Sequence, residues 1–196
     1  MPRPILLGRS QFTSLREAGC LYVDKSRFVC EVLDAPAEVV LYPRPRRFGK
    51  TLNMSMLQAF FEVVRARSSL FRDLQVWQNP AAMAHFQQHP VVSLTFKDVK
   101  HRDWPNALLR IRGLLAAEVA RHQAAIHDGR LDQGTRDRLL AILHGDGDPG
   151  GFLLDLCVAL HLHHGTHAHT CYFFSEAMAI AVIPDALIAS ITSINC

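Results

Sequence analysis

The segment Arg44-Pro-Arg-Arg-Phe-Gly-Lys-Thr51 constrains the fold of this chain most, because it ends in Gly-Lys-Thr directly after a strand-like run. That run, residues 38–42, is apolar after Glu38, and residues 52–62 have the composition of a helix. A strand, a tight loop, Gly-Lys-Thr and a helix form the context of a phosphate-binding loop, or P-loop. In such a loop, backbone N–H groups and the helix N-terminus face a polyphosphate. We therefore expect a nucleotide site here.

The individual residues of the segment have distinct expected roles. Lys50 would contact the β- and γ-phosphates, the Thr51 hydroxyl would bind Mg²⁺ through the nucleotide, and Gly49 would let the backbone approach the phosphates. The full P-loop pattern has glycine where Arg44 stands, so a solvent-facing basic turn, or one that serves nucleic acid, is the alternative. The predicted nucleotide-binding residues are Arg46, Arg47, Phe48, Gly49, Lys50, Thr51 and Leu52.

Several spaced motifs extend this interpretation. They are Phe12-Thr-Ser-Leu-Arg16 with Gly19, Tyr22-Val-Asp-Lys-Ser26, Leu-Asn-Met-Ser-Met-Leu after Thr51, and Pro90-Val-Val-Ser-Leu-Thr-Phe96. With the Gly-Lys-Thr segment they resemble the AAA-ATPase-like family of bacterial proteins, from about Leu6 to about Gly165. The resemblance implies a P-loop NTPase-like fold (a Walker A nucleotide site) with ATP and Mg²⁺ as ligands, and the family itself lacks the first glycine. Its full-length members often carry a C-terminal nuclease-like domain of the PD-(D/E)XK type, which does not follow in this chain.

The order of apolar patterns predicts the fold class. Strand-like runs at 39–42 and 91–96 alternate with helical patterns at 25–33, 52–65, 105–123, 135–143 and 152–162. Such alternation is typical of a parallel α/β sheet, and we expect a three-layer α/β/α arrangement that is incomplete. We expect residues 1–165 to form the P-loop domain and residues 166–196 to be a divergent tail without a recognisable domain.

The tail also affects the expected activity. The resemblance implies an apolar run ending in Asp-Glu-Tyr-Asp after Gly165, whereas the chain reads Thr166-His-Ala-His-Thr-Cys-Tyr-Phe-Phe174. We interpret this as a truncated or frame-shifted end that supplies no central strand, and Asp98 as a turn residue rather than the metal-holding acid. The expected function is ATP binding without hydrolysis. The alternatives are an active ATPase, and a non-catalytic interaction or nucleic-acid-associated module.

Composition limits the remaining possibilities. A net charge of +3 gives no strong attraction to nucleic acid or membranes, and five scattered cysteines suit a reducing cytoplasm. Histidines crowd between residues 161 and 169, where zinc is an alternative to solvated side chains. The apolar residues 172–194 are interrupted by charge and proline, so we expect no membrane span. Asp24 and Lys25 form either a surface ion pair or part of the nucleotide pocket. A protein partner and the oligomeric state are not indicated.

Overall fold

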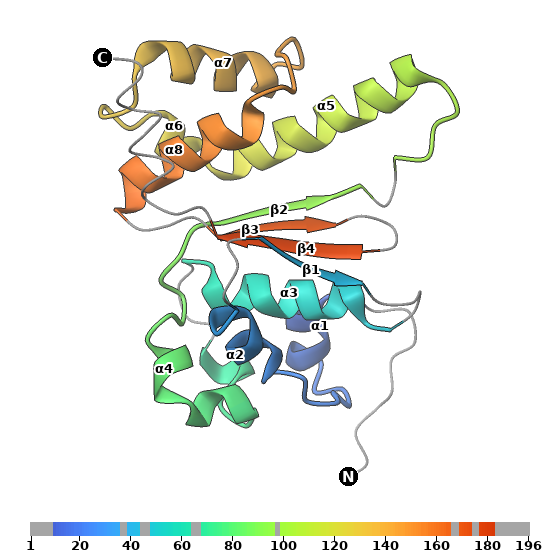
Figure 1. Ribbon diagram of the computed structural model, residues 1–196, viewed down its shortest axis with the longest axis vertical. Helices are drawn as coiled ribbons and strands as arrows, with labels where there is room; N and C mark the ends of the chain where they lie inside the picture. The colour runs from blue at the N-terminus through green and yellow to red at the C-terminus, as the bar shows by residue number, and fades with distance from the viewer. Residues whose placement is uncertain are drawn as a thin grey trace.

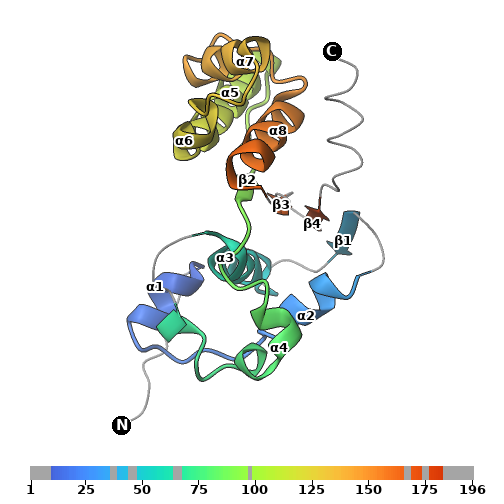
Figure 2. The ribbon, with the colours of Figure 1, turned by 90° about the vertical axis from the view of Figure 1, so that its left-hand side faces the viewer.

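The molecule has an α/β fold built on one sheet with both parallel and antiparallel strands. A computed structural model describes residues 10–35, 39–43, 48–63, 68–96, 99–165, 169–173 and 177–182. A four-stranded sheet lies between two layers of helices, the first four helices of the chain on one face and the last four on the other (Figure 1). Figure 2, turned by 90°, shows the same two layers on opposite sides of the strands. The arrangement agrees with the predicted α/β class and its three layers.

The lower helical layer is built around aromatic side chains. Phe12, Phe60 and Phe71 are fully buried, and the ring centroid of Phe71 lies 4.8 Å from that of Phe12 and 5.5 Å from that of Phe60. The central helix of this layer, α3 (Lys50–Phe61), is buried on most of its surface, as expected for a helix with apolar residues on nearly all sides. The elements are α1 (Phe12–Glu17), α2 (Phe28–Leu33), α3 (Lys50–Phe61), α4 (Pro80–Met83) and the 3₁₀ turns η1 (Ser68–Leu70) and η2 (Gln75–Gln78).

The upper layer contains α5 (Trp104–Arg121), α6 (Gln123–Ile126), α7 (Gln133–Leu143) and α8 (Phe152–His164). Two of these helices begin at an aspartate whose carboxylate accepts a hydrogen bond from a helix N–H group. Asp103 accepts from Asn106 at 2.9 Å, and Asp132 accepts from Thr135 at 2.9 Å. Such caps satisfy N–H groups that lack a partner within the helix, which fixes where the helix starts.

Two helices of the lower layer are shorter than predicted. Helix α2 begins at Phe28 rather than at Lys25, because Asp24 folds the preceding residues into a turn by accepting a 2.8 Å hydrogen bond from the N–H of Ser26. Helix α3 ends at Phe61 rather than near residue 65. Glu62 is extended there (ψ 129°), and the N–H of Val63 donates to the carbonyl of His89 at 3.1 Å.

The sheet is mixed, so the prediction of a parallel sheet is not confirmed. Its order is β1 (Val39–Pro43), β4 (Ala177–Val182), β3 (His169–Phe173) and β2 (Val91–Thr95). Among the neighbouring strands that the structure describes, only β2 and β3 are parallel, whereas β4 is antiparallel to both of its neighbours. The three residues 174–176 that join β3 to β4 are too few for a parallel crossover, which needs a dozen residues or more.

The tail contributes the two central strands, β3 and β4, which lie between β1 and β2. The expectation that residues after 166 supply no central strand was therefore wrong. The β-branched and aromatic residues of His169-Thr-Cys-Tyr-Phe173 favour a strand, although they do not match the sequence that the family resemblance implies. The boundary at residue 165 stays a prediction, with both of its sides contributing to one sheet.

Candidate functional site

Gly49 joins the strand region to α3 in a left-handed conformation. It is the N-cap of the helix with φ 75° and ψ 18°, and its carbonyl accepts a 2.9 Å hydrogen bond from the N–H of Asn53. This region of φ and ψ favours glycine, because a side chain there meets its own backbone. The N-terminal amides of a 12-residue helix therefore begin directly at the Gly-Lys-Thr motif.

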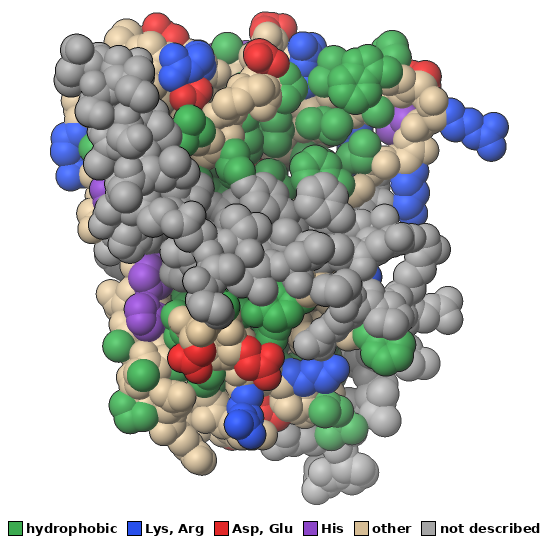
Figure 3. Space-filling view, viewed as in Figure 1, with side chains coloured by type: hydrophobic (Ala, Val, Ile, Leu, Met, Phe, Trp, Pro, Cys, Tyr) green, Lys and Arg blue, Asp and Glu red, His purple; other side chains and the backbone are tan. Residues whose placement is uncertain are grey.

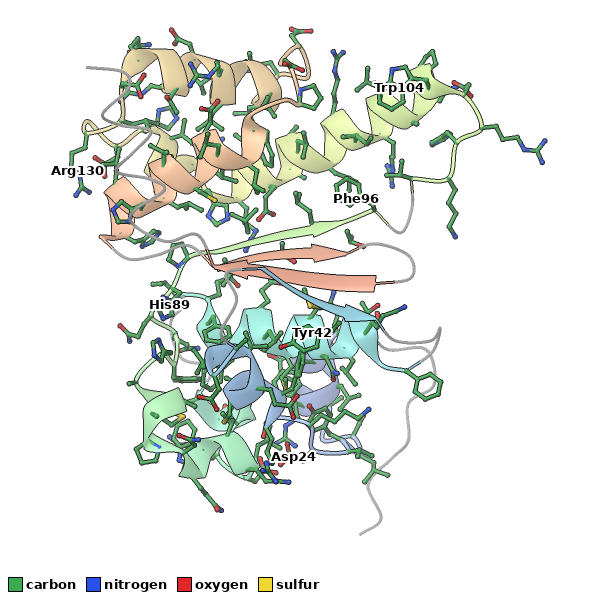
Figure 4. The ribbon with its side chains drawn as sticks, viewed as in Figure 1. Asp24, Tyr42, His89, Phe96, Trp104 and Arg130 are labelled. Atoms are coloured by element: carbon green, nitrogen blue, oxygen red, sulfur yellow. The ribbon has the colours of Figure 1, made fainter. Side chains whose placement is uncertain are left out.

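The end of β1 is fixed against the lower layer. Tyr42 packs edge-on against Phe28 of α2, with ring centroids 4.8 Å apart, and Figure 4 shows Tyr42 between the sheet and the lower helices. Because β1 and α3 are separated by only six residues, this packing limits where the loop between them can run. Strand, loop and helix thus follow one another as the sequence predicted.

The structure brings five of the seven predicted binding residues together. Phe48 is 61% exposed, and Gly49, Lys50, Thr51 and Leu52 are half-buried in the first turn of α3. Leu52 also packs against the lower core, which ties this turn to the folded interior. The other two, Arg46 and Arg47, lie outside the described residues.

The turn around Lys25 approaches the same place from a different part of the chain. A Cβ atom added at Gly49 would lie 3.8 Å from Lys25 Nζ and, apart from the adjoining residues Phe48 and Lys50, would meet no other described atom within 4 Å. A surface ion pair between Asp24 and Lys25 was one alternative from the sequence, and the structure does not show this pair. Instead the Asp24 carboxylate accepts from the N–H groups of Ser26 at 2.8 Å and Gln75 at 2.9 Å.

These hydrogen bonds also set the charge of Asp24. Burial alone would raise its pKa, but the hydrogen bonds from the N–H groups of Gln75 and Ser26 favour the carboxylate and bring the pKa below its usual value. Figure 4 shows Asp24 in the lower layer, beneath α3. The sequence indicates this turn only through the aspartate two residues before Ser26, and it does not indicate the contact with Gln75 of η2.

The strand ends define one edge of the sheet. Since β1 and β3 are both antiparallel to β4, and β2 is parallel to β3, the strands β1, β2 and β3 run in the same direction. Their carboxyl ends therefore share the edge from which the chain enters α3. Asp98 follows β2 by three residues and Glu176 follows β3 by three, and both lie outside the described residues.

A pocket on the other face of the sheet has a different character. It measures about 460 Å³ and lies between the end of β2, the middle of α5 and the start of α8, and all of its described lining residues are apolar or glycine. Figure 3 shows hydrophobic side chains gathered on this part of the upper layer, and Figure 4 shows Phe96 between β2 and α5. Without a charged or polar side chain, this pocket does not suit phosphate. Its lining includes Leu94, Phe96, Ile111, Leu115, Phe152 and Leu153.

The histidine-rich stretch forms no metal centre in the described part of the chain, where no group of three or more histidine, cysteine or acidic side chains converges. His163 instead lies 2.8 Å from a carboxylate oxygen of Asp128, and Gly165 ends α8 with φ 67°. His167 lies outside the described residues. Burial, and then the neighbouring His163 and His122, lower the pKa of His164. The zinc alternative therefore receives no support from the described residues.

Two further expectations concern cysteines and membranes. Cys20, Cys30 and Cys157 are free thiols, and the cytoplasmic location stays a prediction. Among the described helices, none combines the length and the apolar character needed to cross a bilayer.

The comparison with protein families matches a model described as predicted AAA-ATPase over residues 6–165. The match covers most of the chain, and the chain belongs to this AAA-ATPase-like family. No curated protein and no solved structure matches the chain. The family confirms the resemblance read from the spaced motifs, and the strand–loop–helix around Gly49 lies inside the matched region.

Proposed function

We propose that this protein binds ATP with Mg²⁺ at the N-terminus of α3. The observation that carries the proposal is the left-handed Gly49 that caps α3 immediately before Lys50 and Thr51. This geometry is what a P-loop needs where the backbone passes the phosphates. Membership of a family of predicted ATPases supports a nucleoside triphosphate as the ligand.

The described residues fit such a ligand. Around a Cβ position on Gly49, and apart from the adjoining residues Phe48 and Lys50, the described atom within 4 Å is the Lys25 ammonium nitrogen, so positive charge borders the space beside the helix start. Lys50 supplies a full charge for the β- and γ-phosphates, and the amides of the first turn supply partial charges. Thr51 supplies a hydroxyl for Mg²⁺, and the ion in turn neutralises the charge of the phosphates.

Arg46, Arg47, Phe48 and Leu52 complete the proposed site. The two arginines flank the phosphates from the loop, as the family resemblance implies. The ring of Phe48 is exposed at the molecular surface, where it can cover a bound ligand. Leu52 anchors the first turn of α3 in the lower core.

We further propose that bound ATP is not hydrolysed at a rate above background. The strand that follows Gly165 reads His169-Thr-Cys-Tyr-Phe173 and carries no carboxylate, whereas the family resemblance implies an acidic element at this point. Catalysis of phosphoryl transfer depends on holding the metal and orienting water. Binding through Lys50 and Thr51 alone stabilises substrate and transition state about equally, which does not accelerate the chemical step. A binding module is therefore favoured over an active enzyme.

Calorimetric titration tests the binding half of the proposal. Purified wild type should bind Mg²⁺–ATP, Lys50→Ala should abolish that binding, and Lys100→Ala should keep it, because Lys100 is an exposed lysine before α5. Equal affinities of wild type and Lys50→Ala would remove the P-loop assignment.

A phosphate-release assay tests the second half. Wild type should release phosphate no faster than Lys50→Ala. Robust release that is lost in Asp98→Ala or in Glu176→Gln would instead identify one of these residues as the missing acid, and the active-ATPase alternative would be correct.

A further inference from the structure

Lys25 is the described cation that comes closest to the start of α3 from outside the Gly-Lys-Thr motif. Its Nζ atom would be 3.8 Å from a Cβ at Gly49, although the two residues are 24 positions apart in sequence. The side chain is exposed, and no carboxylate pairs with it in the part of the chain that the structure describes. Among the described residues, therefore, no neighbouring acid neutralises its charge.

The backbone on either side of Lys25 is held in place. Asp24 accepts a 2.9 Å hydrogen bond from the N–H of Gln75, and the Ser26 hydroxyl accepts a 3.0 Å hydrogen bond from the N–H of Val76. Ser26 is completely buried. The two residues that flank Lys25 are thus bonded to consecutive amides of η2, so only the lysine side chain itself needs to be ordered when it meets a ligand.

The electrostatics of this arrangement favour an anion. The N-terminus of a helix carries partial positive charge, so cations are normally stabilising at helix C-termini and not here. Lys25 adds a full charge beside that N-terminus, 3.8 Å from a Cβ position on Gly49. Lys25 and the positive end of the helix dipole therefore attract a group of negative charge to the start of α3.

We propose that Lys25 is a second phosphate-binding cation of this site, and that the ligand class is a nucleoside polyphosphate held between α3 and the Lys25 turn. The inference rests on the proposed function. It adds that the turn containing Asp24, Lys25 and Ser26 is a part of the nucleotide site. Because charge on the β- and γ-phosphates is what a second cation recognises, the residue favours ATP over AMP.

Titration calorimetry with Mg²⁺–ATP and with AMP, on wild type, Lys25→Ala, Lys25→Arg and Lys100→Ala, tests the proposal. Lys25→Ala should weaken ATP binding by about 5- to 20-fold, as expected for loss of one charge-assisted contact. Lys25→Arg should retain most of the affinity, Lys100→Ala all of it, and AMP binding should change little in any variant. Thermal unfolding should be the same for Lys25→Ala and wild type, since the side chain is exposed.

The outcomes separate the inference from the proposed function. If wild type binds ATP in a Lys50-dependent way and Lys25→Ala binds it equally well, only the role of Lys25 is overturned. Equal losses for ATP and AMP would also overturn it, because the effect would not follow the added phosphates. If wild type binds no ATP, the proposed function and this inference are both wrong.

Discussion

The carboxylate of Glu118 on α5 accepts a 2.8 Å hydrogen bond from the backbone N–H of Ser93 in β2. The same carboxylate accepts a 3.1 Å hydrogen bond from Arg121 Nε, and Arg121 in turn forms an ion pair with Glu62 and donates to the carbonyl of Val91. The buried carboxylate of Glu118 thus has hydrogen-bond partners in the edge strand β2 and in the guanidinium of Arg121. The same guanidinium also contacts Glu62, the residue after the end of α3. These contacts join both helical layers to β2.

Removing this acid should destabilise the fold. We expect Glu118→Ala to lower the free energy of unfolding by about 2–4 kcal/mol, because it leaves the N–H of Ser93 and part of the Arg121 charge without a partner. Urea denaturation followed by circular dichroism measures the change. Glu17→Ala is the matched control, since Glu17 is exposed, and its effect should stay within about 0.5 kcal/mol. Equal effects of the two substitutions would contradict the role assigned to Glu118.

The same group makes stability depend on pH. Burial alone would raise the pKa of Glu118, but the imidazole of His122, 3.4 Å away, and hydrogen bonds from Arg121 and from the N–H of Ser93 lower the pKa below its usual value. A carboxyl with a lowered pKa in the folded state stabilises the protein above its unfolded pKa, near 4.3, and this contribution is lost as the pH falls toward the folded pKa. Unfolding free energies measured between pH 6 and pH 3 should therefore fall more steeply for wild type than for Glu118→Gln. Parallel curves would show that Glu118 does not titrate as described.

Two glycines with positive φ allow the effect of backbone strain to be distinguished from an effect on ATP binding. Gly49→Val should lose ATP binding, because the branched side chain forces the loop amides away from the phosphates at a φ of 75°. Gly145→Val is the control, since Gly145 also has a positive φ, 87°, but lies in a loop after α7. Each substitution should cost about 1–3 kcal/mol of stability from strain. Only the first should affect affinity in a titration, and loss of binding in both would point to a global effect.

Thr51 should make ATP binding depend on Mg²⁺. Thr51→Ala removes the hydroxyl and should abolish the gain in ATP affinity that Mg²⁺ gives to wild type, whereas Thr51→Ser keeps the hydroxyl and should preserve it. Titrations with and without excess chelator measure this difference. If Thr51→Ala responds to Mg²⁺ as wild type does, the hydroxyl is not a ligand of the ion.

The three long helices of the upper layer, α5, α7 and α8, were predicted from the sequence, because local signals and tertiary packing agree there, whereas the short helix α6 was not predicted. Helices α5 and α7 have amphipathic patterns, and Asp103 and Asp132 cap them, so their bounds differ from the predicted ones by no more than two residues. The direction of the strands was less accessible. The run Ala177–Val182 is continuously apolar, and such a run does not distinguish a strand from a buried helix or reveal the direction of pairing.

The site was predictable only in part for a related reason. Gly49, Lys50 and Thr51 are contiguous, so their pattern alone indicates a phosphate loop. The approach of Lys25 to Gly49 depends instead on hydrogen bonds that Asp24 and Ser26 accept from N–H groups of η2, some 50 residues away in sequence. Such a contact cannot be predicted from sequence periodicity. The family resemblance identifies the motif around Lys25 but does not show where it lies in the fold.

Mapping of backbone amide signals by NMR on the isotope-labelled 22.0 kDa protein, with and without Mg²⁺–ATP, tests the central claim most directly. We expect the largest shifts at residues 48–52, with smaller shifts around Lys25. We also expect signals from the apolar pocket, such as that of Leu115, to stay unchanged. Shifts confined to the pocket between β2, α5 and α8, with residues 48–52 unaffected, would contradict a nucleotide site at the start of α3.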